Sequence, residues 1–176
     1  MSAPSFDPIT DARAAGRNAI DEKAGKRLLE RFGLKAPNSV VVSDAHGVEA
    51  ATAGLNAPFA VKVMSPDILH KSDSGGVRIN LANATEIRDA ITAMAETPAI
   101  RNCTIDGYLI EEMAPTGQEV VIGGVLEPQF GPMIMVGLGG VFVEILADVA
   151  FRLCPITERD AGAMLRDLRC APLLAG

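Results

Sequence analysis

Aromatic residues are scarce in this sequence: its 176 residues include no tryptophan, one tyrosine and six phenylalanines. Nearly half of the residues (48%) are nonetheless apolar. That is enough for a sizeable core in one ordinary domain or in two small lobes. We therefore expect a core built from valine, isoleucine, leucine, methionine and alanine.

Runs of basic residues are also missing, and the formal net charge is −6. Proteins that bind nucleic acid need a cationic surface, so nucleic acid is not expected as the main partner. Small anionic ligands stay compatible with this composition, because they need only a few local donors. No apolar run approaches membrane-spanning length, so no membrane partner is expected.

Cysteine is rare as well, and the three present, Cys103, Cys154 and Cys170, are widely spaced. An odd number at these spacings forms neither a zinc pattern nor a disulfide framework. Free thiols are typical of a reducing compartment. The first residues contain no apolar signal core and no arginine-rich transit helix. We therefore expect a cytoplasmic protein.

Hydrophobic spacing predicts a chain that alternates between helices and strands, which is typical of an α+β fold. Helices are expected at residues 10–34, 44–55, 83–96 and 157–169, with Asp44 and Thr157 as N-caps. Strands are expected at residues 39–43, 58–64, 75–81, 107–113, 118–126 and 131–138, with one more before residue 157. Glycine and proline separate the strands at 107–113, 118–126 and 131–138, so these three are expected to form an antiparallel meander.

Lys62 stands in the middle of the apolar strand predicted at 58–64. A lysine is expensive to bury unless it meets an anion; the alternative is an edge-strand lysine that reaches water. The loop that follows ends in Gly75 and Gly76, and glycine-rich turns can present backbone N–H groups to phosphate oxygens. A strand lysine followed by a glycine-ended loop predicts a site for nucleotide phosphates, although no Walker motif occurs.

His70, one of only two histidines, lies in the same polar loop between two strands. A loop histidine without a role is the ordinary interpretation. The functional interpretation is a nucleophile or an acid–base group. Its neighbours Lys71, Ser72 and Asp73 could orient the ring or neutralise a phosphoryl group on it, but this spacing alone leaves both interpretations open.

Carboxylates gather at the predicted strand ends. Glu111 and Glu112 come just before Met113, and Glu119 begins the next strand. Such carboxylates could bind ribose hydroxyls beside backbone groups that contact adenine, or they could simply face solvent. Glu144 and Asp148 follow the glycine-rich stretch GLGG, where oxygen ligands could hold Mg²⁺ or could merely end a strand.

Three long stretches carry a family resemblance: PFAVKVMSPDILHKSDSGGVRINL, GYLIEEMAPTGQEVVIGG and PQFGPMIMVGLGGVFVEILADVAFRLCPITERDA. Together with the final APLLAG they resemble the ATP-grasp module, of the beta-subunit type, of the ADP-forming (NDP-forming) acyl-CoA synthetases, which are relatives of succinyl-CoA synthetase. The resemblance begins near Asp21 and continues to the end of the chain in the family's order. It implies an ATP-grasp fold of two lobes, with mixed or antiparallel sheets and flanking helices. Residues 1–20 would be a flexible leader and the start of the first helix, 21–105 the N-terminal lobe, and 106–176 a partial C-terminal lobe.

The resemblance also implies roles for single residues. Lys62 would contact the phosphates of ATP. His70 would be the catalytic residue, carrying a phosphoryl group on a mobile loop between the nucleotide site and a CoA-binding subunit. The hinge around adenine and ribose would include Glu111, Met113 and Glu119. The full set of expected nucleotide-binding residues is Lys62, Gly75, Gly76, Glu111, Met113, Glu119 and Glu144.

The activity implied is the reversible conversion of acyl-CoA, ADP and phosphate into a carboxylic acid, ATP and CoA. The expected cofactors are ATP or ADP and Mg²⁺, and the expected partner is an alpha-type CoA-binding subunit or domain that delivers acyl-CoA or acyl phosphate. In the family the module continues past the LLAG point to an acidic E-x-D-x-NP motif that resembles magnesium ligands, and this sequence lacks that motif.

We therefore expect a truncated C-terminal lobe, metal ligands outside this chain, and no complete reaction by this chain alone. One alternative is a non-catalytic module of the same fold that binds a nucleotide or only a partner. Another is an interaction module that forms a homo-oligomer through open strand edges.

Overall fold

The computed structural model describes residues 7–68, 70–140 and 147–174. The chain divides into two compact units, Met1–Ala114 and Pro115–Gly176. Each unit combines helices with an antiparallel sheet, as expected of an α+β protein. No helix in the described ranges is long and apolar enough to cross a membrane.

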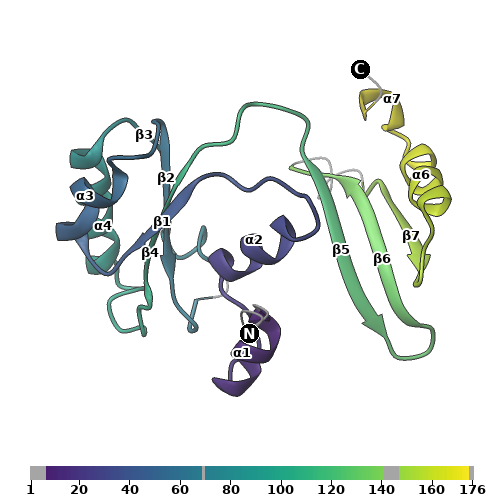
Figure 1. Ribbon diagram of the computed structural model, residues 1–176, viewed down its shortest axis with the longest axis horizontal. Helices are drawn as coiled ribbons and strands as arrows, with labels where there is room; N and C mark the ends of the chain where they lie inside the picture. Colours follow the sequence, from purple (N-terminus) through teal and green to yellow (C-terminus); the bar gives the residue numbers. More distant parts are fainter. Residues whose placement is uncertain (1–6, 69, 141–146, 175–176) are drawn as a thin grey trace, which may run out of the picture. The chain divides into compact units, whose positions relative to one another are not determined.

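The first unit is built on a four-stranded sheet with the strand order β1-β4-β2-β3, all of whose pairings are antiparallel. Its strands are β1 (Ser39–Val42), β2 (Phe59–Met64), β3 (Val77–Leu81) and β4 (Gly107–Glu112). Its helices are α1 (Pro8–Ala14), α2 (Glu22–Glu30), the 3₁₀-helix η1 (Ala45–Gly47), α3 (Val48–Thr52) and α4 (Ala84–Glu96). Within this unit α3 and α4 lie on one side of the sheet and α2 on the other (Figure 1).

The single helix predicted over residues 10–34 is two helices, α1 and α2, so that expectation was wrong. Gly16, just after the end of α1, has a left-handed φ of 69°. A new helix then begins where the side chain of Asp21 accepts a hydrogen bond from the backbone N–H of Ala24, at 2.8 Å. A glycine stop followed by an aspartate N-cap accounts for the break.

Strand β4 also differs from its prediction, because it does not begin a meander with the two strands that follow it. It lies between β1 and β2, with Glu111 opposite Ser39 and Leu109 opposite Lys62. The side chains of Tyr108, Leu109 and Ile110 are buried although they alternate between the two faces of the sheet, which suits their continuous apolar run. The boundary expected near residues 105–106 therefore falls after Ala114, because β4 belongs to the sheet of the first unit.

The core of the first unit lies between helix α4 and the sheet. The side-chain oxygen of Asn83 caps α4 by accepting a hydrogen bond from the N–H of Glu86, at 3.0 Å. Residues on one face of the helix are fully or almost fully buried: Ile87, Ile91 and Met94. They share a hydrophobic cluster with alternate residues of β2: Phe59, Val61 and Val63. Because strand side chains alternate, Lys62 points to the opposite face, on the side of α2.

The second unit is a three-stranded meander with the order β5-β6-β7. Its elements are β5 (Val120–Glu127), β6 (Gly131–Leu138), β7 (Val149–Leu153), α6 (Glu158–Asp167) and α7 (Ala171–Leu174). Helix α6 packs on β6 and β7 in a small core made of Val136, Ala150, Met164 and Leu168. The predicted N-cap Thr157 is confirmed, and it forms a capping box with Asp160.

Candidate functional site

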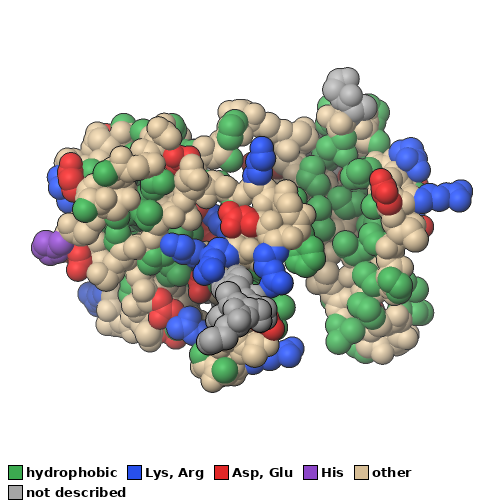
Figure 2. All heavy atoms as spheres, in the orientation of Figure 1, with side chains coloured by type: hydrophobic (Ala, Val, Ile, Leu, Met, Phe, Trp, Pro, Cys, Tyr) green, Lys and Arg blue, Asp and Glu red, His purple; other side chains and the backbone are tan. Residues whose placement is uncertain are grey.

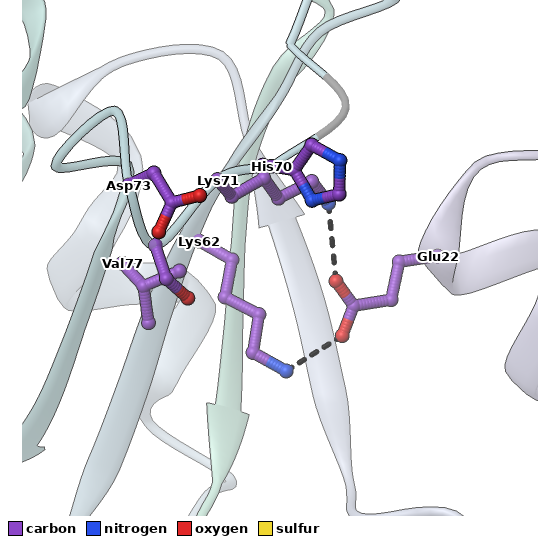
Figure 3. A pocket seen from close by; sticks show the side chains of 7 residues that line it. Glu22, Lys62, His70, Lys71, Asp73 and Val77 are labelled. Atoms are coloured by element: carbon purple, nitrogen blue, oxygen red, sulfur yellow. Dashed lines mark hydrogen bonds and ion pairs between the residues drawn. The ribbon is translucent and has the colours of Figure 1, made fainter. Parts of the chain in front are cut away.

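An open pocket of about 450 Å³ lies within the first unit, beside β2 and the loop that leads to β3. It brings together the two residues that the sequence suggested separately, Lys62 and His70. Side chains from α2, β2 and the loop surround it, as Figure 3 shows. The residues that line it are Glu22, Lys62, His70, Lys71, Ser72, Asp73 and Val77.

Lys62 is not an edge-strand lysine, since β2 pairs with β4 on one side and β3 on the other. Its side chain is 23% exposed. Its Nζ atom lies 2.6 Å from Oε1 of Glu22 and 2.6 Å from Oε1 of Glu111. The lysine thus meets anions, which is the condition under which a lysine in an apolar strand is tolerated.

Glu111 supplies one of these anions from the neighbouring strand. It is two residues beyond Leu109, the residue opposite Lys62, so it lies diagonally across the strand pair within reach of a long side chain. Its side chain is only 7% exposed, and its second oxygen, Oε2, binds Nζ of Lys26. Glu111 therefore lies inside an ion-pair group, whereas the sequence suggested a carboxylate at an exposed strand end.

Glu22 supplies the second anion from the first turn of α2. Its Oε1 atom accepts from Nζ of Lys62 at 2.6 Å and from Nζ of Lys26 at 3.0 Å, and its Oε2 accepts from Nζ of Lys71 at 3.1 Å. Burial disfavours the charged carboxylate, but the hydrogen bonds from Lys62 and Lys26 outweigh this and lower the pKa of Glu22 from 4.5 to about 2. Glu22 is therefore ionised at neutral pH.

These side chains form one lysine–glutamate cluster, defined as Glu22, Lys26, Lys62, Lys71 and Glu111. Burial acts to lower the pKa of Lys62, but hydrogen bonds to Glu111 and Glu22 outweigh it and raise that pKa. With three cationic and two anionic groups, the cluster has one positive charge in excess. The carboxylate of Asp73, which also lines the pocket, balances this excess. An anionic ligand would therefore be bound by the nearby ammonium groups of Lys62 and Lys71 rather than by a net charge of the pocket.

Glu22 and Lys26 were not predicted from the sequence as site residues, and Lys71 was predicted only as a neighbour of His70. Glu22 and Lys26 are spaced i, i+4 on one helix, which predicts their mutual ion pair. Nothing in that spacing shows that both also meet residues of the sheet.

The loop that carries His70 is a compact turn with an exposed histidine. The carbonyl oxygen of His70 accepts from Oγ of Ser74 at 3.0 Å and from its backbone N–H at 3.3 Å. Lys71, next to His70, extends to Glu22. The loop is therefore held at one end by its own hydrogen bonds and at the side by the lysine–glutamate cluster.

Gly75 and Gly76 end this turn, in positions that only glycine occupies easily. The N–H of Gly75 donates to the carbonyl of Ser72 at 3.2 Å, and that of Gly76 donates to the carbonyl of Lys71 at 2.7 Å. In this conformation both amides bond within the loop, whereas the sequence suggested that they are presented to phosphate. Gly75 has a φ of 72°. A Cβ atom on Gly76 would lie 2.5 Å from Cγ1 of Val63, so only glycine allows the loop to lie this close to β2.

The predicted hinge residues lie in different units. Met113, in the first unit, donates its N–H to the carbonyl of Pro58 at 3.0 Å, and its Sδ accepts from the N–H of Asn80 at 3.2 Å. Glu119 belongs to the second unit, where its carbonyl oxygen accepts from the N–H of Gly139 at 2.7 Å. A Cβ atom on Gly139 would lie 2.7 Å from Cβ of Glu119, so this glycine permits a close packing contact. Contacts of Met113 and Glu119 with a nucleotide stay predictions.

The described residues contain no ready-made group of metal-binding side chains. Nowhere in residues 7–68, 70–140 and 147–174 do three His, Cys, Asp or Glu side chains group so that they could hold a metal ion. Glu22 and Glu111 bind lysines. Asp148 accepts hydrogen bonds from the N–H groups of Arg169 and Cys170, at 2.9 and 2.8 Å, which is a structural role. Glu144 lies outside the described residues.

Residues 11–176 match the family model described as ATP-grasp domain. The chain belongs to the ATP-grasp family. Within this family it is similar to the beta subunit of acetate–CoA ligase [ADP-forming] I from Pyrococcus furiosus, with 40% identity over 99% of this chain and 75% of the relative. It is also 41% identical to 4-hydroxybutyrate–CoA ligase [ADP-forming] from Nitrosopumilus maritimus, over 97% of this chain but only 24% of that longer protein.

Solved structures agree with this assignment. The chain superposes with a TM-score of 0.89 and 36% identity on acetyl-coenzyme A synthetase 1 of Ca. Korarchaeum cryptofilum in complex with coenzyme A and Ca-AMPCP, covering 98% of this chain and 76% of that one. Another structure of that enzyme, with Mg-AMPPCP, has a phosphohistidine segment pointing towards the nucleotide-binding site; its TM-score is 0.79 at 35% identity, covering 98% of this chain and 75% of that one. The family resemblance and the ATP-grasp fold expected from the sequence are confirmed. ATP-grasp domains bind nucleotides, so this family also supports a nucleotide site in the chain.

Proposed function

We propose that this chain is the nucleotide-binding, phosphohistidine-bearing module of an ADP-forming acyl-CoA synthetase. The observation that carries the proposal is the pocket that Lys62, Lys71 and His70 share. The similarity to acetate–CoA ligase beta subunits supports the reaction class.

In this proposal Lys62 binds the phosphates of ATP, and its raised pKa keeps it cationic while it does so. An imidazole nitrogen of His70 attacks the γ-phosphorus. A nitrogen–phosphorus bond forms, the bond from the γ-phosphorus to the bridging oxygen breaks, ADP leaves, and the ring N–H proton passes to solvent. Transfer of this kind depends mainly on positioning and on charge neutralisation, which the two lysines of the pocket supply.

The other half of the reaction belongs to a CoA-binding partner subunit or domain. There acyl-CoA and phosphate would give acyl phosphate and CoA, and the acyl phosphate would pass its phosphoryl group to His70 and leave as the carboxylate. His70 would then phosphorylate ADP. We therefore expect the complete reaction only when the partner is present.

Labelling with γ-labelled ATP in a magnesium buffer tests the role of His70. We expect acid-labile, base-stable label on the full chain and no label on His70→Ala. The matched control is His46→Ala, which removes the other histidine; its side chain is 97% exposed on η1. Label that survives in His70→Ala, or that disappears in His46→Ala, would contradict the assignment.

Calorimetry tests the role of Lys62. We expect Lys62→Ala to weaken ATP binding about tenfold or more, because a charge-assisted contact to phosphate is lost. His70→Ala should bind ATP as the unchanged chain does. ATP binding without any label on His70 would favour the alternative, a non-catalytic nucleotide-binding module of the same fold.

A further inference from the structure

Glu22 is the point at which three lysines of the first unit converge. They come from three different segments: Lys26 from α2, Lys62 from β2 and Lys71 from the loop beside His70. Figure 3 shows Glu22 reaching from α2 towards Lys62 and Lys71 at the wall of the pocket. One carboxylate thus joins the His70 loop to β2, an inner strand of the sheet.

The two oxygens of this carboxylate divide the lysines between them. Oε1 binds Lys62 at 2.6 Å and Lys26 at 3.0 Å, and Oε2 binds Lys71 at 3.1 Å. An anion whose oxygens accept hydrogen bonds from several ammonium groups uses the same ligand chemistry as a phosphate group. Lys62 has a second carboxylate partner in Glu111, so it would keep a counter-ion if the carboxylate of Glu22 moved away from it.

We infer that Glu22 is a resident counter-anion that occupies the phosphate position between Lys62 and Lys71 and that an incoming phosphate group displaces. The inference rests on the proposed function, because it assumes that phosphates bind at this pocket. Glu22 is then a residue that sets phosphate affinity and holds the His70 loop on the cluster while the position is free of phosphate. A bound phosphate would replace the carboxylate of Glu22 as the partner of Lys71.

Removing the charge of Glu22 separates this role from a merely structural one. Glu22→Gln leaves the cluster with two positive charges in excess, and it removes the competitor for Lys62 and Lys71. We expect tripolyphosphate, which has no base or sugar, to bind about tenfold tighter to Glu22→Gln in calorimetry at low ionic strength. If Glu22 served only to order the lysines, its loss would weaken binding.

Glu30→Gln is the matched control, because it removes one negative charge from an exposed position on the same helix. We expect this variant to bind tripolyphosphate within about twofold of the unchanged chain, since distant surface charges are screened. Equal tightening in Glu30→Gln and Glu22→Gln would reduce the effect to net charge and overturn the inference. Unchanged or weaker binding to Glu22→Gln would overturn it as well.

A second variant covers the case in which Glu22→Gln does not fold. Glu22→Asp keeps the charge but withdraws the carboxylate by one methylene, so we expect a smaller tightening of the same sign, and weaker binding would refute the inference. Lys62→Ala distinguishes the two proposals. If it leaves ATP and tripolyphosphate binding unchanged, the proposed function fails; if it weakens both while Glu22→Gln tightens neither, only the inference about Glu22 fails.

Discussion

Strands β2 and β5 have similar apolar sequences, FAVKVM and VVIGGVLE, but very different surroundings. Every residue of β2 except Lys62 is buried, whereas Ile122, Val125 and Leu126 of β5 are each more than half exposed. Figure 2 shows hydrophobic side chains at the surface over β5 and β6. An apolar strand sequence therefore does not determine whether the strand is covered.

The difference follows from the layers within each unit. In the first unit β2 has strands on both sides, α4 packed on one face, and the lysine–glutamate cluster on the other. In the second unit β5 is the first strand of the order β5-β6-β7, and α6 packs on β6 and β7. The first unit thus provides a buried framework that can position charged groups, which loosely covered strands do less well.

The largest expected effect compares Ile110 of β4, fully buried, with Ile122 of β5, 66% exposed. Ile110→Ala should lower the free energy of unfolding by about 2–5 kcal/mol, because it leaves a cavity, and Ile122→Ala should change it by no more than about 0.5 kcal/mol. Urea titration measures both, with fluorescence of Tyr108, the single tyrosine, reporting on the first unit and circular dichroism on the whole chain.

If Ile110→Ala does not fold, Ile110→Val should still cost about 0.5–1.5 kcal/mol. Equal losses at Ile110 and Ile122 would show that the two strands are equally covered, and the comparison would be wrong.

The second prediction concerns the charged face of the first unit and its dependence on pH. Because its folded-state pKa of about 2 lies below the ordinary 4.5, Glu22 stabilises the fold above pH 4.5 and loses this effect as pH falls towards 2. The unfolding free energy of the unchanged chain should exceed that of Glu22→Gln by at most about 3 kcal/mol at neutral pH. Urea titrations at several pH values should show this difference shrink between about pH 5 and pH 2. A difference that does not change with pH would contradict the ion pairs.

The third prediction compares a crowded glycine of the first unit with an open one of the second. Gly76→Ala places a Cβ atom 2.5 Å from the buried Val63, so we expect a loss of about 1–3 kcal/mol and an altered His70 loop. A Cβ atom on Gly117 would meet nothing within 4 Å. Gly117→Ala should therefore be neutral or stabilise by about 0.4–1 kcal/mol, which thermal denaturation can measure. Equal effects at both positions would argue against the close approach of the loop to β2.

The smallest effect expected is at the N-terminus of α6, where the second unit depends on local hydrogen bonds. Thr157→Ala removes the hydroxyl that accepts from the N–H of Asp160 at 3.2 Å, so we expect a loss of about 1 kcal/mol in circular dichroism melts. Thr157→Ser, which keeps the hydroxyl, should lose much less. Identical losses in the two variants would show that the capping box does not matter.

Local patterns in the sequence were enough to predict most of the elements. The helix at Ala84–Glu96, the strand at Phe59–Met64 and the cap Thr157 occur as expected. Asp44 is also an N-cap, but of the short 3₁₀-helix η1, and α3 begins separately after Gly47. These features were predictable because periodicity and capping act within a few residues of the chain. The error at residues 15–21 came from a glycine stop and an aspartate cap inside a pattern that otherwise continued as a helix.

The neighbours of each strand were harder to predict. The strand Gly107–Glu112 was expected to pair with the strands after it, but it lies between β1 and β2 instead. Pairing over such sequence separations depends on which faces can be buried together. The apolar sequence of β4 does not indicate which strands it pairs with.

The sequence by itself determined the family and most of the elements, and it singled out Lys62 and His70 as candidate site residues. These features can be read from the sequence because motifs and periodicity involve residues that are close together in the chain. Only the tertiary structure placed Glu22 of α2 and Glu111 of β4 beside Lys62, with Lys71 of the His70 loop joined through Glu22. These residues are far apart in the chain, and their charges act on one another only where the packing of the helix on the sheet brings them within a few ångströms.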